Sequence, residues 1–251
     1  QFFNWRDKEI LGREKSLEGL HRNLIGLDHE TDDGVSEEND TLAYVQRSAH
    51  SAMISTESVQ LAMERGGNLI NPDWPSNGLA NSLKVIAQLI KGRSDTSVYY
   101  ARQGGYDTHN NQVFEDGPLS GRHFDLLQIL NGALGAFVDE MKAQGNWDRV
   151  VILTFSEFGR KVIQNGSYGT DHGAAETLFL MGGQVAGNQY YGLYPDLAED
   201  ARVSRNSMQY NVDFRTVYRS VLEKWMGVPP SAMSAIFPLP PRDFQPLDII
   251  R

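Results

Sequence analysis

The chain has 251 residues, a formal net charge of -9 and no cysteine, and 40% of its residues are hydrophobic. The negative charge argues against a nucleic-acid backbone or an anionic membrane surface as the main partner, because both would repel the protein. The lack of cysteine excludes disulfides and thiolate-bound zinc, so a metal would need oxygen and nitrogen ligands. We expect one large globular domain, residues 1–251, with no membrane-spanning segment and no signal peptide.

The first part of the chain, residues 1–92, is expected to be mostly helical. Leucines three or four residues apart favour a helix before residue 28, and a second helical pattern ends at Gly66-Gly67. The acidic segment 28–40 separates the two patterns and is expected to be a solvated loop. A third helix is predicted over 79–91, where apolar residues share one face.

Residues 93–228 show a pattern typical of α/β proteins. Apolar strands are predicted at 97–101, 150–155 and 177–181, and a long helix over 119–144 separates the first two strands. A strand, a helix and a strand in this order indicate a right-handed βαβ unit. A continuous apolar strand is typical of a parallel sheet that is covered on both faces. The sequence therefore predicts an α/β fold with a parallel sheet.

The carboxyl-terminal part is predicted to contain one more helix and an extended tail. The helix covers residues 213–225, with Asp213 as its N-cap. The proline-rich tail, residues 229–251, cannot easily continue a helix and is expected to lie on the surface in extended form.

Three short polar clusters carry the clearest chemical information. Asp107 and His109 follow the first predicted strand, Glu157 follows the second, and Asp171 and His172 precede the third. Side chains beyond the carboxyl ends of parallel strands meet at one edge of a sheet, where such folds bind ligands. Carboxylates and imidazoles suit zinc, manganese or iron, so we expect one or two divalent metal ions at this edge.

Arg160 adds a guanidinium group that suits an oxygen of an anionic substrate. Each of these six residues has an ordinary structural role as its alternative: the aspartates could form turns, the histidines could be hydrogen-bonded loop residues, and Glu157 could pair with Arg160. Their concentration at predicted strand ends favours the functional interpretation. The sequence has no Gly-x-Ser-x-Gly elbow, Walker loop or dinucleotide-binding glycine fingerprint.

The three clusters resemble motifs of the bacterial family catalogued as domain of unknown function 1501. They are Gly104-Gly105-Tyr106-Asp107-Thr108-His109, Ser156-Glu157-Phe158-Gly159-Arg160 and Gly169-Thr170-Asp171-His172-Gly173. The resemblance continues through Asp213-Phe214-Arg215 to Trp225, and it implies that the chain covers the carboxyl-terminal part of a longer domain. That family is similar to the alkaline phosphatase and sulfatase superfamily, which implies a three-layer α/β/α sandwich with a mainly parallel sheet.

The resemblance implies a metal-dependent hydrolase of phosphate or sulfate esters, exported to the periplasm or secreted, with a small anionic ester as substrate. Arg160 would be the catalytic residue that clamps the anion. The implied metal ligands are Asp107, His109, Glu157, Asp171 and His172. In the superfamily's Ser-Asp-His-Gly segment this chain has Glu157 for aspartate and Phe158 for histidine, which removes one ligand. The alternative is a non-catalytic secreted binding or scaffold protein on a degenerate hydrolase fold.

Overall fold

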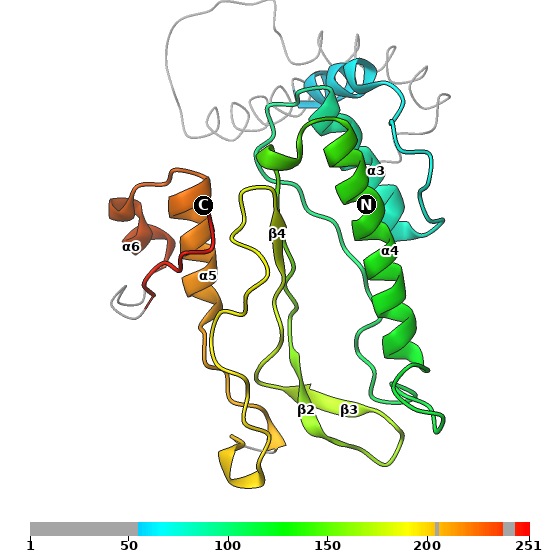
Figure 1. Cartoon of the computed structure of the whole chain (residues 1–251), viewed down its shortest axis with the longest axis vertical. Coiled ribbons are helices and arrows are strands. Elements are labelled where there is room, and N and C mark those ends of the chain that lie inside the picture. The colour runs from blue at the N-terminus through cyan, green and yellow to red at the C-terminus, as the bar shows by residue number, and fades with distance from the viewer. Residues whose placement is uncertain (1–54, 204–205, 238–243) are drawn as a thin grey trace, which may run out of the picture. The chain divides into compact units, whose positions relative to one another are not determined.

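The part of the chain that the computed structural model describes consists of residues 55–203, 206–237 and 244–251 (Figure 1). The chain divides into two compact units, Gln1–Leu61 and Ala62–Arg251, and the fold below is that of the second unit, apart from the first residues of one helix. The helix predicted before residue 28 and the predicted acidic loop lie outside the described residues. A helix over residues 55–66 ends at Gly67, whose φ of 54° lies in the left-handed region.

Two helices, α3 (Gly78–Lys91) and α4 (Arg122–Ala143), form the main hydrophobic core, and both lie where the sequence predicts helix. The Asn77 side chain caps α3 by accepting a hydrogen bond from the Ala80 amide. Several of the contacting residues are alanines, which let the two helices approach closely. The buried cluster consists of Leu79, Ala80, Leu83, Ala87, Ala133, Phe137 and Met141.

Glu140 on α4 has a buried carboxylate whose hydrogen bonds hold the segment before α3 against the two helices. Its oxygens accept hydrogen bonds from the Ile70 amide at 3.0 and 3.1 Å, from the Asn71 amide at 2.6 Å and from the Gln144 side chain at 2.6 Å. The side chain is completely inaccessible to solvent. A buried carboxylate needs such donors because it loses its hydration shell, so Glu140 determines where the chain enters α3.

In the described part of the chain, four short strands form two separate antiparallel pairs. The strand β1 (Val151–Leu153) pairs with β4 (Leu180–Gly182), and β2 (Gly159–Gln164) pairs with β3 (Thr170–Gly173). The chain thus leaves β1, forms the β2–β3 hairpin, and returns to β4 beside β1 (Figure 1).

The predicted α/β fold, a three-layer α/β/α sandwich with a mainly parallel sheet, is therefore wrong for the described residues. Residues 97–101, predicted as a strand, form no ladder with β1, and Val98 and Tyr100 are 67% and 69% exposed. A parallel neighbour requires a crossover, usually a helix, whereas the connection from β1 to β4 contains a hairpin and allows an antiparallel return. The apolar run at β1 has another cause, because Val150 and Ile152 pack against the helical core.

The β2–β3 hairpin is bulged, and its turn is held by Asn165. Arg160 lies opposite His172 and Gln164 opposite Thr170, with a shift of register between these pairs. The Asn165 side-chain oxygen accepts hydrogen bonds from the Ser167 and Gly169 amides. A bulge bends a strand and re-aims its side chains, which is common beside functional sites.

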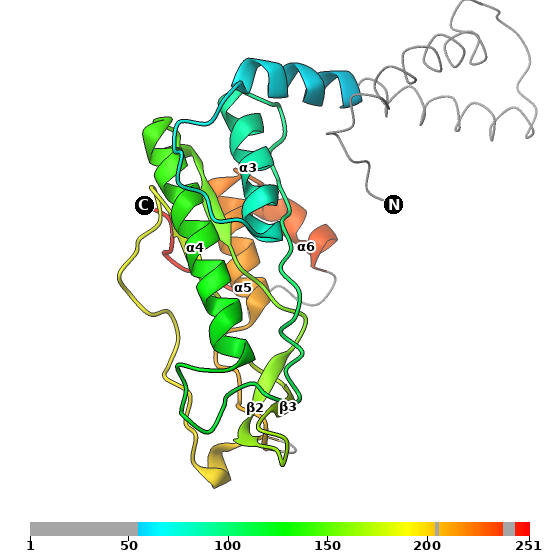
Figure 2. The same ribbon diagram turned by 90° about the vertical axis from the view of Figure 1, so that its right-hand side faces the viewer.

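The carboxyl-terminal part contains the predicted helix, here α5 (Phe214–Ser220) followed by a π-helical turn, η4 (Val221–Trp225). The predicted extended tail is partly helical, since it includes η5 (Pro230–Ala232) and α6 (Met233–Ile236). Residues 244–251 lie against other parts of this unit: the Leu247 amide donates to the buried Ser220 hydroxyl, and the Arg251 amide donates to the Gln184 carbonyl group. Figure 2 shows α5 and α6 from a second direction.

Two further short elements are the 3-10 turns η1 (Trp147–Arg149) and η2 (Glu199–Ala201). Among the described residues, none of the helices combines the length and apolarity that crossing a bilayer demands.

Candidate metal centre

The candidate site lies where the loop before α4 meets the β2–β3 hairpin, next to the amino-terminal end of α4 (Figures 1 and 2). The loop runs along the hairpin turn: the Asn111 amide donates to Ser167, the Gln112 and Val113 amides donate to Tyr168, and the Thr170 amide donates to Thr108. These main-chain bonds join two parts of the chain that are about sixty residues apart in sequence.

Thr108 anchors the loop between Asp107 and His109. Its side chain is 1% exposed and donates a hydrogen bond of 2.8 Å to the Gln112 side-chain oxygen, which also accepts a bond of 2.7 Å from the Thr170 hydroxyl. The Thr108 amide donates to the Tyr106 carbonyl oxygen at 2.9 Å, which makes a γ-turn around Asp107. Thr108 is thus held inward by its hydrogen bonds, whereas the side chains of Asp107 and His109 are about half exposed and contact each other.

Asp107, His109 and His172 meet at this point and form a group that could hold a metal ion. Asp107 Oδ1 lies 3.0 Å from His109 Nε2 and 2.7 Å from His172 Nε2. One ligand atom from each residue lies within 4.8 Å of the others. The side chains of the three residues are about half exposed, so an ion or a substrate can reach them from solvent.

These separations fit metal ligands. Two ligands bound at about 2.1 Å lie about 3 Å apart when they subtend a right angle at the metal. Without a cation, each contact between Asp107 and an imidazole requires a proton on Nε2. A divalent ion would take the place of those protons, and two imidazoles with one carboxylate are ligands typical of zinc, manganese and iron.

Asp171, a predicted ligand, contacts the other side of His109. Its Oδ1 lies 3.3 Å from His109 Nδ1, and its Oδ2 accepts a hydrogen bond of 3.0 Å from Lys161 Nζ. A proton on Nδ1 directed at Asp171 would leave Nε2 free to bind a metal. In this geometry Asp171 orients His109, and the bond from Lys161 fixes the position of Asp171.

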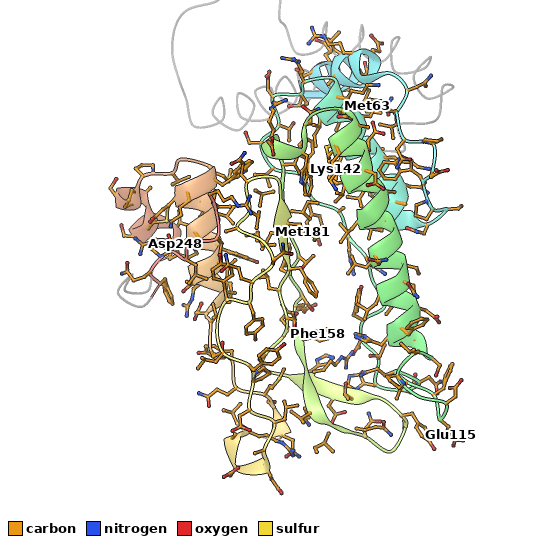
Figure 3. All side chains as sticks on the ribbon, in the orientation of Figure 1. Met63, Glu115, Lys142, Phe158, Met181 and Asp248 are labelled. Carbon is orange, nitrogen blue, oxygen red and sulfur yellow. The ribbon has the colours of Figure 1, made fainter. Side chains whose placement is uncertain are left out.

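Glu157 and Phe158 precede β2, but only Phe158 contacts one of the three residues of the group. Glu157 is exposed and, within the described part of the chain, makes no hydrogen bond or ion pair, so the structure does not bring it into the group. Phe158 lies where the chain enters β2 (Figure 3), with its ring stacked on His172 at a centroid distance of 3.8 Å and an angle of 8°. Phe158 thus covers one face of a candidate ligand.

Arg160, predicted to clamp an anion, contacts the protein itself. Nη1 donates to the Thr170 carbonyl oxygen at 2.7 Å, and Nη2 donates to the Tyr106 carbonyl oxygen and lies 3.3 Å from Asp107 Oδ1. Its side chain is only 18% exposed. Three acceptors on the protein therefore already face this guanidinium group.

The two aspartates are held in their charged form. The hydrogen bond from His172 is the largest of the effects that lower the pKa of Asp107, and the charges of His109, His172 and Arg160 act in the same direction. The hydrogen bond and charge of Lys161 lower the pKa of Asp171. An anionic carboxylate is the form that binds a metal, so Asp107 needs no deprotonation at neutral pH.

Glycines in the motifs permit the close packing of this region. A Cβ on Gly169 would lie 2.6 Å from the Asn110 amide nitrogen and closer still to the His109 carbonyl group, and a Cβ on Gly173 would overlap the Arg160 carbonyl group. Both glycines have ordinary φ values, so they are needed for space rather than for conformation. Sequence reasoning missed this role, although both stand at the ends of the Gly-Thr-Asp-His-Gly motif.

Sequence reasoning also missed Gln112 and Lys161. Gln112 joins the loop to β3, and Lys161 supports Asp171. The position of Lys161 directly after Arg160 was the sequence signal that could have indicated its role. The role of Gln112 could not be predicted locally, because it depends on contact between the loop and the distant strand β3.

Comparison with known proteins gives one match. Residues 79–228 match the model of the family described as protein of unknown function (DUF1501). The matched range contains the loop, the β2–β3 hairpin and the whole candidate site. No curated protein and no solved structure matches the chain.

Proposed function

We propose that this chain, which belongs to the DUF1501 family of proteins of unknown function, is a metal-dependent hydrolase of phosphate or sulfate esters. The observation that supports the proposal is the group formed by Asp107, His109 and His172, with a carboxylate oxygen about 3 Å from two imidazole nitrogens. Two separate segments supply these ligands, and several main-chain bonds hold the segments together.

The number of protein ligands favours a catalytic centre over a structural one. Structural zinc sites use four protein ligands, whereas catalytic zinc sites use three and keep a position for water or substrate. Among the described residues three converge here, and all are about half exposed. A divalent ion in such a site supplies Lewis acidity, which withdraws charge from an ester oxygen and makes water more acidic.

The surroundings favour one ion per chain. A second ion would need its own ligands, but Glu157 makes no contact with the group and Phe158 presents a flat apolar ring against His172. The remaining acid, Asp171, already binds Lys161 and His109. The three ligands would hold the ion near the substrate. Arg160 would contact the substrate through any N–H group that its main-chain hydrogen bonds leave free.

Elemental analysis of the protein purified without chelator tests the proposal. We expect close to one transition-metal ion per chain in the wild type and a loss of that ion in His172→Ala. The matched control is Glu157→Ala, which removes an exposed residue of the neighbouring motif and should retain the metal. A wild type that stays metal-free after incubation with zinc and manganese would refute the proposal.

Activity is tested next, with aryl phosphate and aryl sulfate esters as probes. We expect hydrolysis that requires the metal and disappears in Asp107→Ala, while circular dichroism shows that the variant remains folded. Turnover that is unchanged in Asp107→Ala would place the reaction elsewhere on the protein.

A non-catalytic metal-binding or scaffold protein is the second candidate. One observation favours it: Arg160 and Lys161, two cations beside the group, both have protein partners. This function predicts metal binding without turnover of any ester. Export to the periplasm or beyond the cell remains part of the proposal and is tested by locating the protein in cell fractions.

A further inference from the structure

We infer that Arg160 is a positioning residue, which assembles the metal centre by holding its two ligand-bearing segments together. The inference rests on the proposed metal centre and assigns Arg160 a role different from the clamping of a substrate anion.

The guanidinium group of Arg160 joins the loop to the hairpin directly. Nη2 donates to the carbonyl oxygen of Tyr106, the residue immediately before Asp107. Nη1 donates at 2.7 Å to the carbonyl oxygen of Thr170, two residues before His172. One rigid planar group thus fixes the main chain next to two of the three candidate ligands.

The position of Arg160 in the hairpin brings its side chain to this point. Arg160 and His172 are directly paired across β2 and β3, so their side chains are neighbours on one face. The guanidinium carbon also lies 5.0 Å from the centre of the Phe158 ring, and that ring is stacked on His172. Arg160 therefore supports Asp107 through hydrogen bonds and His172 through Phe158.

The limited exposure of Arg160 is consistent with this role. Its side chain is 18% exposed, against 59% for Asp107, and two of its hydrogen bonds are to main-chain oxygens that a substrate does not displace. Lysine could not replace it, because a single ammonium group cannot present the planar fork that reaches both carbonyl oxygens. The other hydrogen bonds between the loop main chain and the hairpin lie at residues 108–113, all beyond Asp107 in the sequence.

The test compares zinc affinity in the wild type, Arg160→Lys and the control Arg102→Lys, using competition with a chromogenic chelator. Arg102 is exposed and makes no hydrogen bond or ion pair in the described part of the chain. We expect Arg160→Lys to bind zinc about 10- to 100-fold more weakly, as found for residues that support metal ligands. Arg102→Lys should bind zinc like the wild type.

Inorganic phosphate, titrated into the zinc-loaded proteins, separates the two roles of Arg160. Unchanged zinc affinity in Arg160→Lys, together with weaker phosphate binding, would overturn the inference in favour of an anion clamp. Unchanged affinity for both would also overturn it while leaving the proposed metal centre intact. A wild type that binds no zinc would instead refute the proposed function on which the inference rests.

Circular dichroism of the metal-free proteins shows whether Arg160→Lys is folded. If it is not, Arg160→Gln takes its place, because the glutamine amide can still donate to one carbonyl oxygen. The expected loss of zinc affinity and the overturning result are the same for this variant.

Discussion

Replacing Gly169 by alanine should damage the metal centre without altering any candidate ligand. The added Cβ would lie 2.6 Å from the Asn110 amide nitrogen and closer still to the carbonyl group of His109. Ordinary van der Waals contacts lie at 3.4–4 Å. The loop and the hairpin must therefore separate by roughly 1 Å at this point, since both contacts are with main-chain atoms.

The size of the effect follows from this separation. Metal ligands must stay within about 0.5 Å of their productive positions, so a shift of about 1 Å should reduce zinc affinity at least tenfold. Overpacking of this kind typically costs about 1–3 kcal/mol of stability. The separation would also weaken the bond from the Asn165 side chain to the His109 carbonyl oxygen and the bond from the Thr170 amide to Thr108.

The assay is chelator competition for zinc, with urea unfolding of the metal-free proteins alongside. Gly166→Ala is the matched control, because Gly166 lies in the same turn and a Cβ there would meet no atom within 4 Å. We expect Gly166→Ala to bind zinc like the wild type and Gly169→Ala to bind it at least tenfold more weakly. Equal affinities in the two variants would show that the close approach at Gly169 does not position His109.

Two further predictions concern the framework around the site. Glu140→Ala should lower the free energy of unfolding in urea by about 2–5 kcal/mol, because it leaves the Ile70 and Asn71 amides without their acceptor. A loss as small as that of the exposed neighbour Asp139→Ala would refute this. Asp213→Asn should melt at a lower temperature than the wild type at pH 7, because the hydrogen bond with Arg215 lowers the pKa of Asp213. The stabilisation from Asp213 is complete above its unfolded-state pKa of about 3.9, and it is lost as the pH falls through the lower pKa of the folded state. The melting temperatures of the two proteins should therefore converge in acid. A difference in melting temperature that persists there would contradict the assignment.

The local features were predictable from the sequence, and the pairing of strands was not. The helix at α3 has a strong apolar face and a clear cap at Asn77, and both signals are local. The proximity of Asp107 and His109 is also local, because only Thr108 separates them in the sequence and a γ-turn is centred on Asp107.

The parallel sheet predicted from the apolar run that contains β1 was wrong, because a continuous apolar strand does not specify the direction of its neighbouring strand. Val150 and Ile152 are covered by helices, as they would be in a parallel sheet, but β1 pairs with β4 in the antiparallel direction. The bond from Arg160 to the Tyr106 carbonyl oxygen and the close approach at Gly169 depend on where the loop crosses the hairpin. That crossing joins residues more than fifty positions apart, and nothing in their local pattern indicates it.

The origin of the ligands in two distant segments has a topological consequence. Asp107 and His172 are separated by 65 positions, so a bound ion would act as a reversible cross-link across that stretch. The closed loop would contain all of α4, β1 and β2. Closing a loop of this length restricts the unfolded chain more than the folded one, so metal should slow amide hydrogen exchange throughout α4, far from the coordinating side chains.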